Sequence, residues 1–315
     1  MKIAFVFPGQ GSQYVGMGKD VFERYEAARE VYRAADRVTG KNISGMCFQG
    51  PDEELIKTVN QQPTIHTTEI AILRVVESYG IRADVTAGFS LGEYAALVCA
   101  GALKFEDTVG LVVKRGTLIQ ECVQMGVGKM AAISGLQRAQ VQEIAGRVTG
   151  SGVVECSNYN CPGQVIISGH NAAVDKGVEM AKALGAKVTF LKVSAPFHTS
   201  LLKEAGTKLH KELNKVDVLE PRITYIPNVT AKPYRKGDDI RTLLDQHVAH
   251  AVMWEDTVYT MLELGVNVFV EIGPGQGISK FNRRTIDAVG GDAEVFHIEN
   301  PDDIESFVSF MNKNS

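Results

Sequence analysis

The chain has 315 residues, of which 44% are hydrophobic and 22% charged, and its formal net charge is −4. This ordinary globular mixture argues against extended disorder, and the balanced charge gives no global attraction to nucleic acid or to an anionic membrane. Five scattered cysteines without a C-x-x-C pair argue against a disulfide framework or a zinc ribbon, and predict reduced thiols in a cytoplasmic protein.

The first part of the chain predicts alternating strands and helices. Residues 2–7 form a nearly continuous apolar run, which is typical of a strand buried on both faces. Pro8-Gly9 ends this run far short of a signal peptide or a transmembrane span, so we expect a cytosolic location. The pattern then predicts helices at 19–37 and 64–79, a strand at 83–88, a small-residue helix at 93–103 and an apolar helix at about 106–124.

The pattern changes at Gly126-Val127-Gly128 and changes back at Pro196. Between these points it predicts strands at 130–134, 153–158, 164–168 and 187–193, with helices at 139–148 and 172–184. This β-α-β-β-α-β order is the ferredoxin-like arrangement. After it we expect a helix at 199–213, a strand at 223–227, helices at 240–250 and 254–264, and a strand at 267–272.

The sequence therefore predicts an α/β fold in two parts. Residues 1–126 and 196–315 form a discontinuous, α/β-hydrolase-like catalytic domain with a parallel sheet. Residues 127–195 form an inserted ferredoxin-like domain.

The segment Gly88-Phe89-Ser90-Leu91-Gly92 is a G-x-S-x-G sequence between a predicted strand and a predicted helix. A nucleophile elbow requires this context, because the turn strains the serine and the glycines let strand and helix approach closely. The Ser90 hydroxyl would stand at a helix N-terminus, where free amides favour negative charge. We predict a catalytic serine; the alternative is a plain tight turn.

A nucleophilic serine needs a base, and seven histidines are available. The pattern favours His198, which lies at a loop–helix junction, although a surface or capping histidine is an alternative. His247 and His250 are three residues apart and could share a helical face. They lack an evident third ligand, so we expect no metal site.

Arg115 has the apolar neighbours Leu111, Val112, Leu118 and Ile119 at helical spacing. A guanidinium in a buried stripe needs a partner, because an unpaired buried charge is very costly. A structural carboxylate and a substrate carboxylate, which a planar guanidinium binds in bidentate fashion, are equally open from the sequence.

Three glycine-containing segments give no assignment by themselves. The segment at 8–13 could offer backbone amides to an anion, and the segment at 273–277 matches neither a P-loop nor a dinucleotide fingerprint. The polar turn at 158–164 is of a kind that is usually structural.

Seven motifs together resemble the malonyl-CoA:acyl-carrier-protein transacylases of bacterial fatty-acid synthesis and the acyltransferase domains of polyketide synthases. They are spread from Phe7 to Gly275 and occur in the family's order. The motifs are FPGQGSQ at 7–13, GFSLGEYAAL at 88–97, KRG at 114–116, SNYNCPGQVIISG at 157–169, APFH at 195–198, PNVTA at 227–231 and EIGPG at 271–275.

The resemblance implies roles for several residues. Ser90 corresponds to the acylated nucleophile, and His198 to the base that activates it. The backbone amides of Gln10 and Leu91 correspond to the oxyanion hole. Arg115 corresponds to the residue that pairs with the malonyl carboxylate.

The resemblance also implies secondary roles. The carbonyl of Met253 would orient the catalytic histidine, Phe197 resembles the form associated with malonyl selectivity, and Asn160 would face the substrate from the small domain. Phe89 departs from the family pattern, which has histidine before the nucleophile. This departure removes a polar group beside the ester.

The implied activity is transfer of malonyl from malonyl-CoA to the phosphopantetheine thiol of acyl carrier protein, by a ping-pong mechanism without cofactor or metal. The family expectation is a monomer. The alternatives are a discrete, trans-acting acyltransferase of a polyketide pathway, an acyl hydrolase that clears carriers, and a non-catalytic docking protein. Because carrier proteins are acidic, Lys280, Arg283 and Arg284 are a candidate docking patch, although such clusters are commonly only solvated faces.

Overall fold

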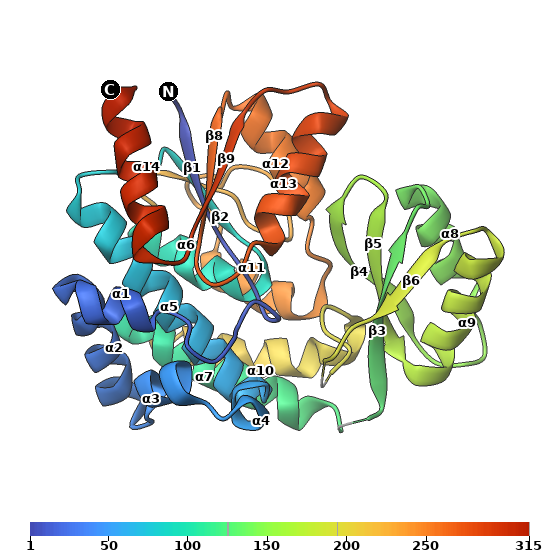
Figure 1. Ribbon diagram of the computed structural model, residues 1–315. Coiled ribbons are helices and arrows are strands. Elements are labelled where there is room, and N and C mark those ends of the chain that lie inside the picture. Colours follow the sequence, from blue (N-terminus) through green and yellow to red (C-terminus); the bar gives the residue numbers. More distant parts are fainter. Residues whose placement is uncertain (125, 194, 315) are drawn as a thin grey trace.

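The computed structural model describes residues 1–124, 126–193 and 195–314. Within these residues two sheets lie side by side, each covered by helices (Figure 1). The larger sheet has five parallel strands in the order β7-β2-β1-β8-β9. The smaller sheet has four antiparallel strands in the order β4-β5-β3-β6. The predicted fold class, a parallel α/β domain with a ferredoxin-like insertion, is confirmed.

The parallel sheet is assembled from strands far apart in the chain. They are β1 (Ile3–Phe7), β2 (Val85–Gly88), β7 (Thr224–Tyr225), β8 (Val268–Ile272) and β9 (Glu294–Ile298). β1 occupies the centre because all its residues are apolar and buried. Its side chains alternate between faces, so Phe5 and Phe7 join the core on one side and Ala4 and Val6 pack with Trp254 on the other.

Helices cover both faces of this sheet (Figure 1). They are α1 (Lys19–Arg24), α2 (Glu26–Thr39), α3 (Ile43–Gln49), α4 (Asp52–Leu55), α5 (Thr58–Ser78), α6 (Glu93–Cys99), α7 (Phe105–Cys122), α10 (Lys203–Leu213), α11 (Ile240–Ala249), α12 (Trp254–Glu263), α13 (Gly277–Ala288) and α14 (Pro301–Lys313), with short 3-10 turns η1 (Ser90–Gly92) and η2 (Ser200–Leu202). The helix predicted at 19–37 is divided at Tyr25, whose backbone is extended.

The inserted sheet has helices on one face only. Its elements are β3 (Gly128–Ser134), α8 (Arg138–Arg147), β4 (Val154–Cys161), β5 (Gln164–His170), α9 (Asn171–Ala183) and β6 (Lys187–Phe190). Along β3, Ala131 and Ile133 pack in the core under the helices. Met130 and Ala132 point the opposite way and line a cavity. The sheet thus turns its uncovered face toward the large domain.

Polar contacts hold the small domain against α12 and the segment just before it. Tyr159 N donates to Val252 O (2.9 Å), and Val252 N donates to Ser157 O (2.9 Å). Arg138 Nη1 donates to both carboxylate oxygens of Asp256, at 2.9 and 2.8 Å. Among the described residues, no helix is long and apolar enough to span a bilayer.

Candidate active site

Ser90 lies on a tight turn between β2 and η1, as the G-x-S-x-G pattern predicts. Its φ is +54°, a left-handed conformation that is strained for a residue with a Cβ atom. The flanking positions exclude any residue with a Cβ atom. A Cβ on Gly88 would lie 1.9 Å from the Gly92 carbonyl carbon, and one on Gly92 would lie 2.2 Å from the Phe7 carbonyl oxygen. The turn is therefore pressed against the end of β1.

Asn228 braces this turn from the loop that follows β7. Its Oδ1 accepts a hydrogen bond from Ser90 N (2.8 Å), and its Nδ2 donates to the Gly88 carbonyl. The side chain is fully buried. One amide thus ties the strained serine to the strand before it, which offsets part of the cost of the left-handed conformation.

The structure brings His198 to the nucleophile, as predicted. His198 Nε2 lies 2.7 Å from Ser90 Oγ, and His198 Nδ1 lies 2.9 and 3.2 Å from the carbonyl oxygens of His247 and His250. Two carbonyls can only accept, so Nδ1 carries the ring proton and Nε2 accepts from the Ser90 hydroxyl. Burial, with the nearby His247 and Arg115, holds the pKa of His198 well below its usual range. The ring is therefore neutral and able to take a proton.

The prediction that the Met253 carbonyl orients this histidine is wrong. Met253 is the N-cap residue of α12, and its carbonyl accepts from both the backbone N and the Oγ1 of Thr257, each at 2.9 Å. The carbonyls that face His198 come instead from the C-terminal end of α11. The last carbonyls of a helix lack intrahelical partners and are free to accept from a side chain.

Arg115 is buried in α7 with 1% of its surface exposed. Its Nη2 donates to Ser90 Oγ at 3.5 Å, and its Nη1 has no hydrogen-bond partner within the described part of the chain. Burial lowers the pKa of this guanidinium. A buried cation with a free donor beside a nucleophile is suited to an anionic substrate group.

Gln10 and Leu91 flank the nucleophile from two segments. Leu91 follows Ser90 at the start of η1, where backbone amides have no partner in the preceding turn. Gln10 lines the same cavity as Ser90, and a Cβ on its neighbour Gly9 would lie 2.6 Å from the Phe89 carbonyl oxygen. The Gln10 side chain is fixed by hydrogen bonds with Gln61 (2.6 Å) and Gln62 (3.0 Å).

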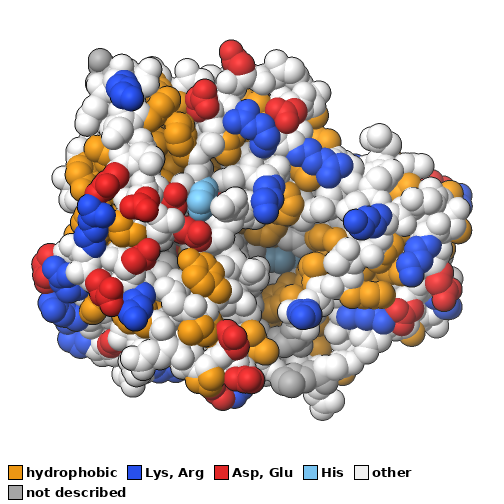
Figure 2. All heavy atoms as spheres, viewed as in Figure 1, with side chains coloured by type: hydrophobic (Ala, Val, Ile, Leu, Met, Phe, Trp, Pro, Cys, Tyr) orange, Lys and Arg blue, Asp and Glu red, His pale blue; other side chains and the backbone are white. Residues whose placement is uncertain are grey.

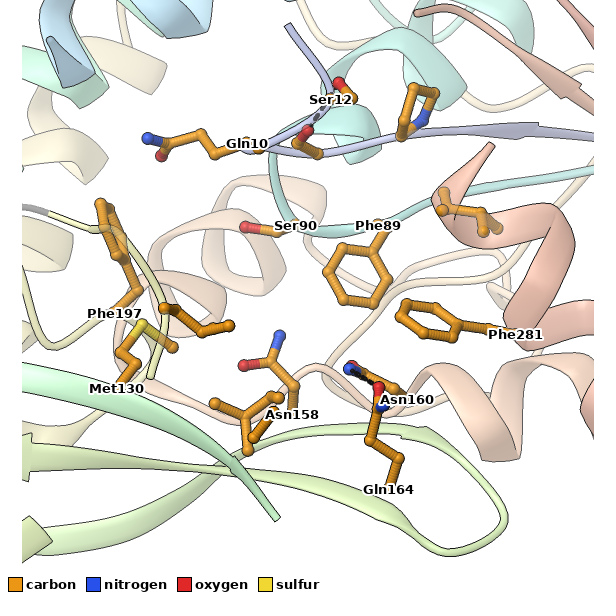
Figure 3. Close-up of a pocket in the computed structure, with 18 of the residues that line it drawn as sticks. Gln10, Ser12, Phe89, Ser90, Met130, Asn158, Asn160, Gln164, Phe197 and Phe281 are labelled. Carbon is orange, nitrogen blue, oxygen red and sulfur yellow. Dashed lines mark hydrogen bonds between the residues drawn. The ribbon is translucent and has the colours of Figure 1, made fainter. Parts of the chain in front are cut away.

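A cavity of about 570 Å³ separates Ser90 from the uncovered face of the small sheet. Figure 3 shows Phe197 and Met130 on one side of it, with Phe89 and Phe281 on the other. The ring of Phe89 packs edge-on against Trp254, with centroids 5.7 Å apart, and lies 6.1 Å from Phe281. An apolar wall therefore borders the nucleophile.

Asn160 faces this cavity from β4 of the small sheet (Figure 3). Its Nδ2 donates to Gln164 Oε1 at 2.9 Å. Its buried Oδ1 has no hydrogen-bond partner in residues 1–124, 126–193 and 195–314. Of the predicted site residues, Gln10, Ser90, Asn160, Phe197 and His198 thus line one cavity. Arg115 and Leu91 adjoin it through Ser90, the first by its Nη2 and the second as the next residue in the chain.

His247 and His250 do not face a common ligand. His247 Nδ1 lies 2.5 Å from Glu93 Oε2, whereas His250 Nδ1 faces its own helix at the Gln246 carbonyl (2.6 Å). No group of three or more His, Cys, Asp or Glu side chains that could bind a metal occurs among the described residues.

Comparison with known proteins gives matches along nearly the whole chain. Residues 4–313 match the family model described as acyl transferase domain. The chain is 42% identical over 303 residues to the malonyl CoA-acyl carrier protein transacylase of Bacillus subtilis (strain 168), covering 94% of this chain and 96% of that protein.

Solved structures agree with this match. The malonyl CoA-acyl carrier protein transacylase of Clostridium perfringens has a TM-score of 0.95 at 39% identity, covering 99% of this chain and 98% of that one. A malonyl-transacylase in complex with a type II polyketide acyl-carrier protein has a TM-score of 0.94 at 34% identity, covering 98% of this chain and 100% of that one.

Proposed function

This chain belongs to the acyl transferase domain family, and from that membership we propose that it transfers malonyl from malonyl-CoA to the phosphopantetheine thiol of acyl carrier protein. It is an acyltransferase of fatty-acid biosynthesis. The observation that carries the substrate assignment is Arg115, whose free Nη1 lies in a buried site beside Ser90. A carboxylate on the acyl group would complete the guanidinium's hydrogen bonds.

In the first half-reaction the Ser90 oxygen attacks the thioester carbonyl while His198 Nε2 takes the hydroxyl proton. The amides of Gln10 and Leu91 donate to the oxyanion, and each such donor contributes about 3 kcal/mol in comparable sites. The carbon–sulfur bond then breaks, and the thiolate of CoA takes the proton from His198. Malonyl remains as an ester on Ser90, with its carboxylate on Arg115.

The second half-reaction reverses these steps with a different thiol. The carrier's phosphopantetheine thiol gives its proton to His198 and attacks the ester carbonyl. The carbon–oxygen bond breaks, and Ser90 recovers the proton. Because one thioester is exchanged for another through an ester, no step needs a redox partner or an energy source, and we propose that the enzyme works without cofactor or metal.

Phe197, Asn160 and Phe89 are proposed to shape the acyl pocket. The buried ring of Phe197 borders the cavity where a branched acyl group would extend, so it favours an unbranched malonyl chain. The free Oδ1 of Asn160 can accept a hydrogen bond from an amide of the pantetheine arm. The packing of Phe89 on Trp254 supports a dry wall beside the ester and so favours transfer over hydrolysis.

The rim of the cavity offers a docking surface for the acidic carrier. Lys280, Arg283 and Arg284 are exposed in one stripe of α13, and Phe281 of the same helix lines the cavity. Figure 2 shows Lys and Arg side chains around the hollow between the two domains. We propose that this stripe binds the carrier.

The docking proposal predicts a selective kinetic change. Reversing the charges with Arg283→Glu and Arg284→Glu should raise KM for the carrier and leave KM for malonyl-CoA unchanged. Arg33→Glu with Arg37→Glu, on exposed positions of the distant helix α2, is the matched control. An unchanged carrier KM would remove the patch from the proposal.

We also propose that the enzyme is a cytoplasmic monomer. All five cysteines are free thiols, which suits a reducing compartment. The alternative of a polyketide pathway concerns the carrier and not the chemistry, and transfer rates to fatty-acid and polyketide carriers would separate the two.

The test of the proposed function is the intact mass after brief mixing with malonyl-CoA, with and without acyl carrier protein. A malonyl adduct that is absent in Ser90→Ala and moves to the carrier is the expected result. An adduct lost to water at the same rate with or without carrier would support the hydrolase instead. No adduct with any acyl-CoA would contradict both enzymatic functions.

A further inference from the structure

A buried acid–imidazole pair lies directly behind the catalytic histidine. His247 of α11 is 1% exposed and Glu93 of α6 is fully buried, and His247 Nδ1 lies 2.5 Å from Glu93 Oε2. The other carboxylate oxygen accepts from Tyr225 OH (2.5 Å) and from Asn228 N (3.1 Å). Two hydrogen bonds thus fix one oxygen of this carboxylate at the beginning of the helix that follows the nucleophile, and the other oxygen faces the His247 ring without a further hydrogen-bond partner among the described residues.

His247 touches the catalytic base in two ways. Its imidazole stacks on that of His198, with ring centroids 4.9 Å apart and planes inclined by 27°. Its carbonyl accepts from His198 Nδ1 at 2.9 Å. Substitution at position 247 removes the ring contact and keeps the carbonyl, so the two contributions can be separated by experiment.

The two rings of the stack have different neighbours. Two imidazolium rings at this separation repel strongly in a buried site, so the pair carries one positive charge at most near neutral pH. Only His247 has a carboxylate at hydrogen-bond distance from a ring nitrogen, whereas His198 faces two carbonyls and the Ser90 hydroxyl. Of the two rings, His247 is therefore the one with an anion beside it.

We propose that His247 is a positioning residue for acyl transfer: with Glu93 as its counter-ion it is the charged partner of the stack, and it keeps His198 neutral and aligned with Ser90. The inference rests on the Ser90–His198 couple of the proposed function. The low pKa of His198, to which burial contributes most and His247 next, agrees with this arrangement.

Other titratable groups surround the stack and contribute to its electrostatics. They are Arg115 on α7, Tyr94 and Glu93 on α6, Tyr225 on β7, and Asp245 and His250 at α11 itself. Arg115 acts on His198 in the same direction as a charged His247, because a second cation also disfavours the imidazolium. Loss of the His247 charge should therefore move the titration of His198 only in part.

The experiment measures the rate at which a fluorophosphonate modifies Ser90 between pH 5 and pH 9. Ser90 Oγ bonds to phosphorus, fluoride leaves and His198 takes the proton, so the rate follows neutral His198 without any need for malonyl-CoA. In His247→Gln the acidic limb should move to higher pH by about one unit, because the neighbouring cation is gone. Glu93→Gln, which keeps the stacked ring but removes its counter-ion, should move the limb in the same direction.

The matched control is His210→Gln. His210 also places Nδ1 against a carboxylate, 2.7 Å from Asp245 Oδ2, but it lies on α10 and does not stack on His198. Its profile should coincide with that of the wild type. The double variant of His247 and Glu93 should shift no further than His247→Gln alone, since the cation that acts on His198 is already absent in His247→Gln.

Two results would overturn the inference: acidic limbs of His247→Gln and Glu93→Gln that coincide with the wild type, or an equal shift in His210→Gln. If His247→Gln fails to fold, Glu93→Gln decides alone. If malonyl-CoA acylates Ser90 in the wild type but the acidic limbs of the variants do not shift, only this inference is removed. If the variants shift but malonyl-CoA does not acylate Ser90 in the wild type, only the proposed function is removed.

Discussion

Arg115 Nη2 lies 3.5 Å from Ser90 Oγ, so a fully buried guanidinium stands beside the nucleophile. The second terminal nitrogen of Arg115 has no partner within the described residues. Burying a cation without an anion costs several kcal/mol. The cost of burying the unpaired Arg115 guanidinium is therefore offset in another state of the protein. In this site that state is the complex with an acyl group that carries a carboxylate.

Replacing Arg115 should therefore change substrate preference. Arg115→Met keeps an unbranched chain that reaches about as far as the arginine Nε, and it removes the guanidinium with its charge. We expect kcat/KM for Ser90 acylation by malonyl-CoA to fall by about 100-fold or more, the usual result of removing one partner of a buried charge pair. Acylation by acetyl-CoA, which has no carboxylate, should be unchanged or faster.

Lys114→Met is the control for this prediction, because it removes the same charge from the exposed neighbouring position. It should leave both substrates unaffected. Equal losses for malonyl-CoA and acetyl-CoA in Arg115→Met would show that Arg115 serves the fold and not the substrate carboxylate.

Asn228 should matter for both stability and rate. Asn228→Ala removes the bonds to Ser90 N and to the Gly88 carbonyl, so it leaves two buried backbone groups without partners. We expect the free energy of unfolding to fall by about 2–3 kcal/mol and Ser90 acylation to slow at least tenfold. Urea unfolding and stopped-flow acylation would measure the two effects.

The control is Thr230→Ala, on the exposed side of the same loop, which should change neither the free energy of unfolding nor the acylation rate. An unaltered acylation rate in Asn228→Ala would contradict the bracing role.

The aromatic wall predicts how the acyl-enzyme partitions. Phe281→Ala opens space beside Phe89, so water gains access to the ester. We expect the ratio of hydrolysis to carrier transfer to rise by about threefold or more, equivalent to about 0.7 kcal/mol. The measurement is the loss of malonyl adduct with and without carrier. Phe310→Ala removes a ring from an aromatic cluster outside the cavity and should not alter the ratio.

Most of the fold could be predicted because its signals are local. The apolar run of β1, the alternation of the inserted domain and the glycines around Ser90 each follow from spacing within a few residues. The hydrophobic periodicity predicts no helix or strand after residue 275, whereas the structure has α13, β9 and α14 there. Helix ends were less predictable than helix positions, as the break at Tyr25 illustrates.

The parts of the site that escaped prediction depend on contacts across the fold. Asn228 lies within a family motif, but its bond to Ser90 N joins residues 138 positions apart. The stack of His247 on His198 and its contact with Glu93 likewise have no local signature. Met253 was the wrong carbonyl because the sequence does not show which free helix-end groups face the histidine.

His66 predicts how stability depends on pH. It is fully buried on α5, and its Nε2 lies 2.7 Å from Thr108 Oγ1. Its Nδ1 lies 3.7 Å from Glu69, but burial raises the pKa of that carboxyl well above its usual range, so the two groups meet as neutral species. Burial lowers the pKa of His66 to about 3.

Because an unfolded histidine titrates near pH 6.5, the unfolded chain binds more protons than the folded protein below that pH. The stability from a neutral His66 is complete above about pH 6.5 and is lost as pH falls toward 3. Between pH 7 and pH 5 the loss is about 2 kcal/mol. In His66→Gln, whose amide can still bond to Thr108, the free energy of unfolding should therefore fall less over this interval. Urea titrations at both pH values measure the difference, with exposed His250→Gln as the control; equal losses in His66→Gln and the wild type would show that His66 is protonated in the folded protein.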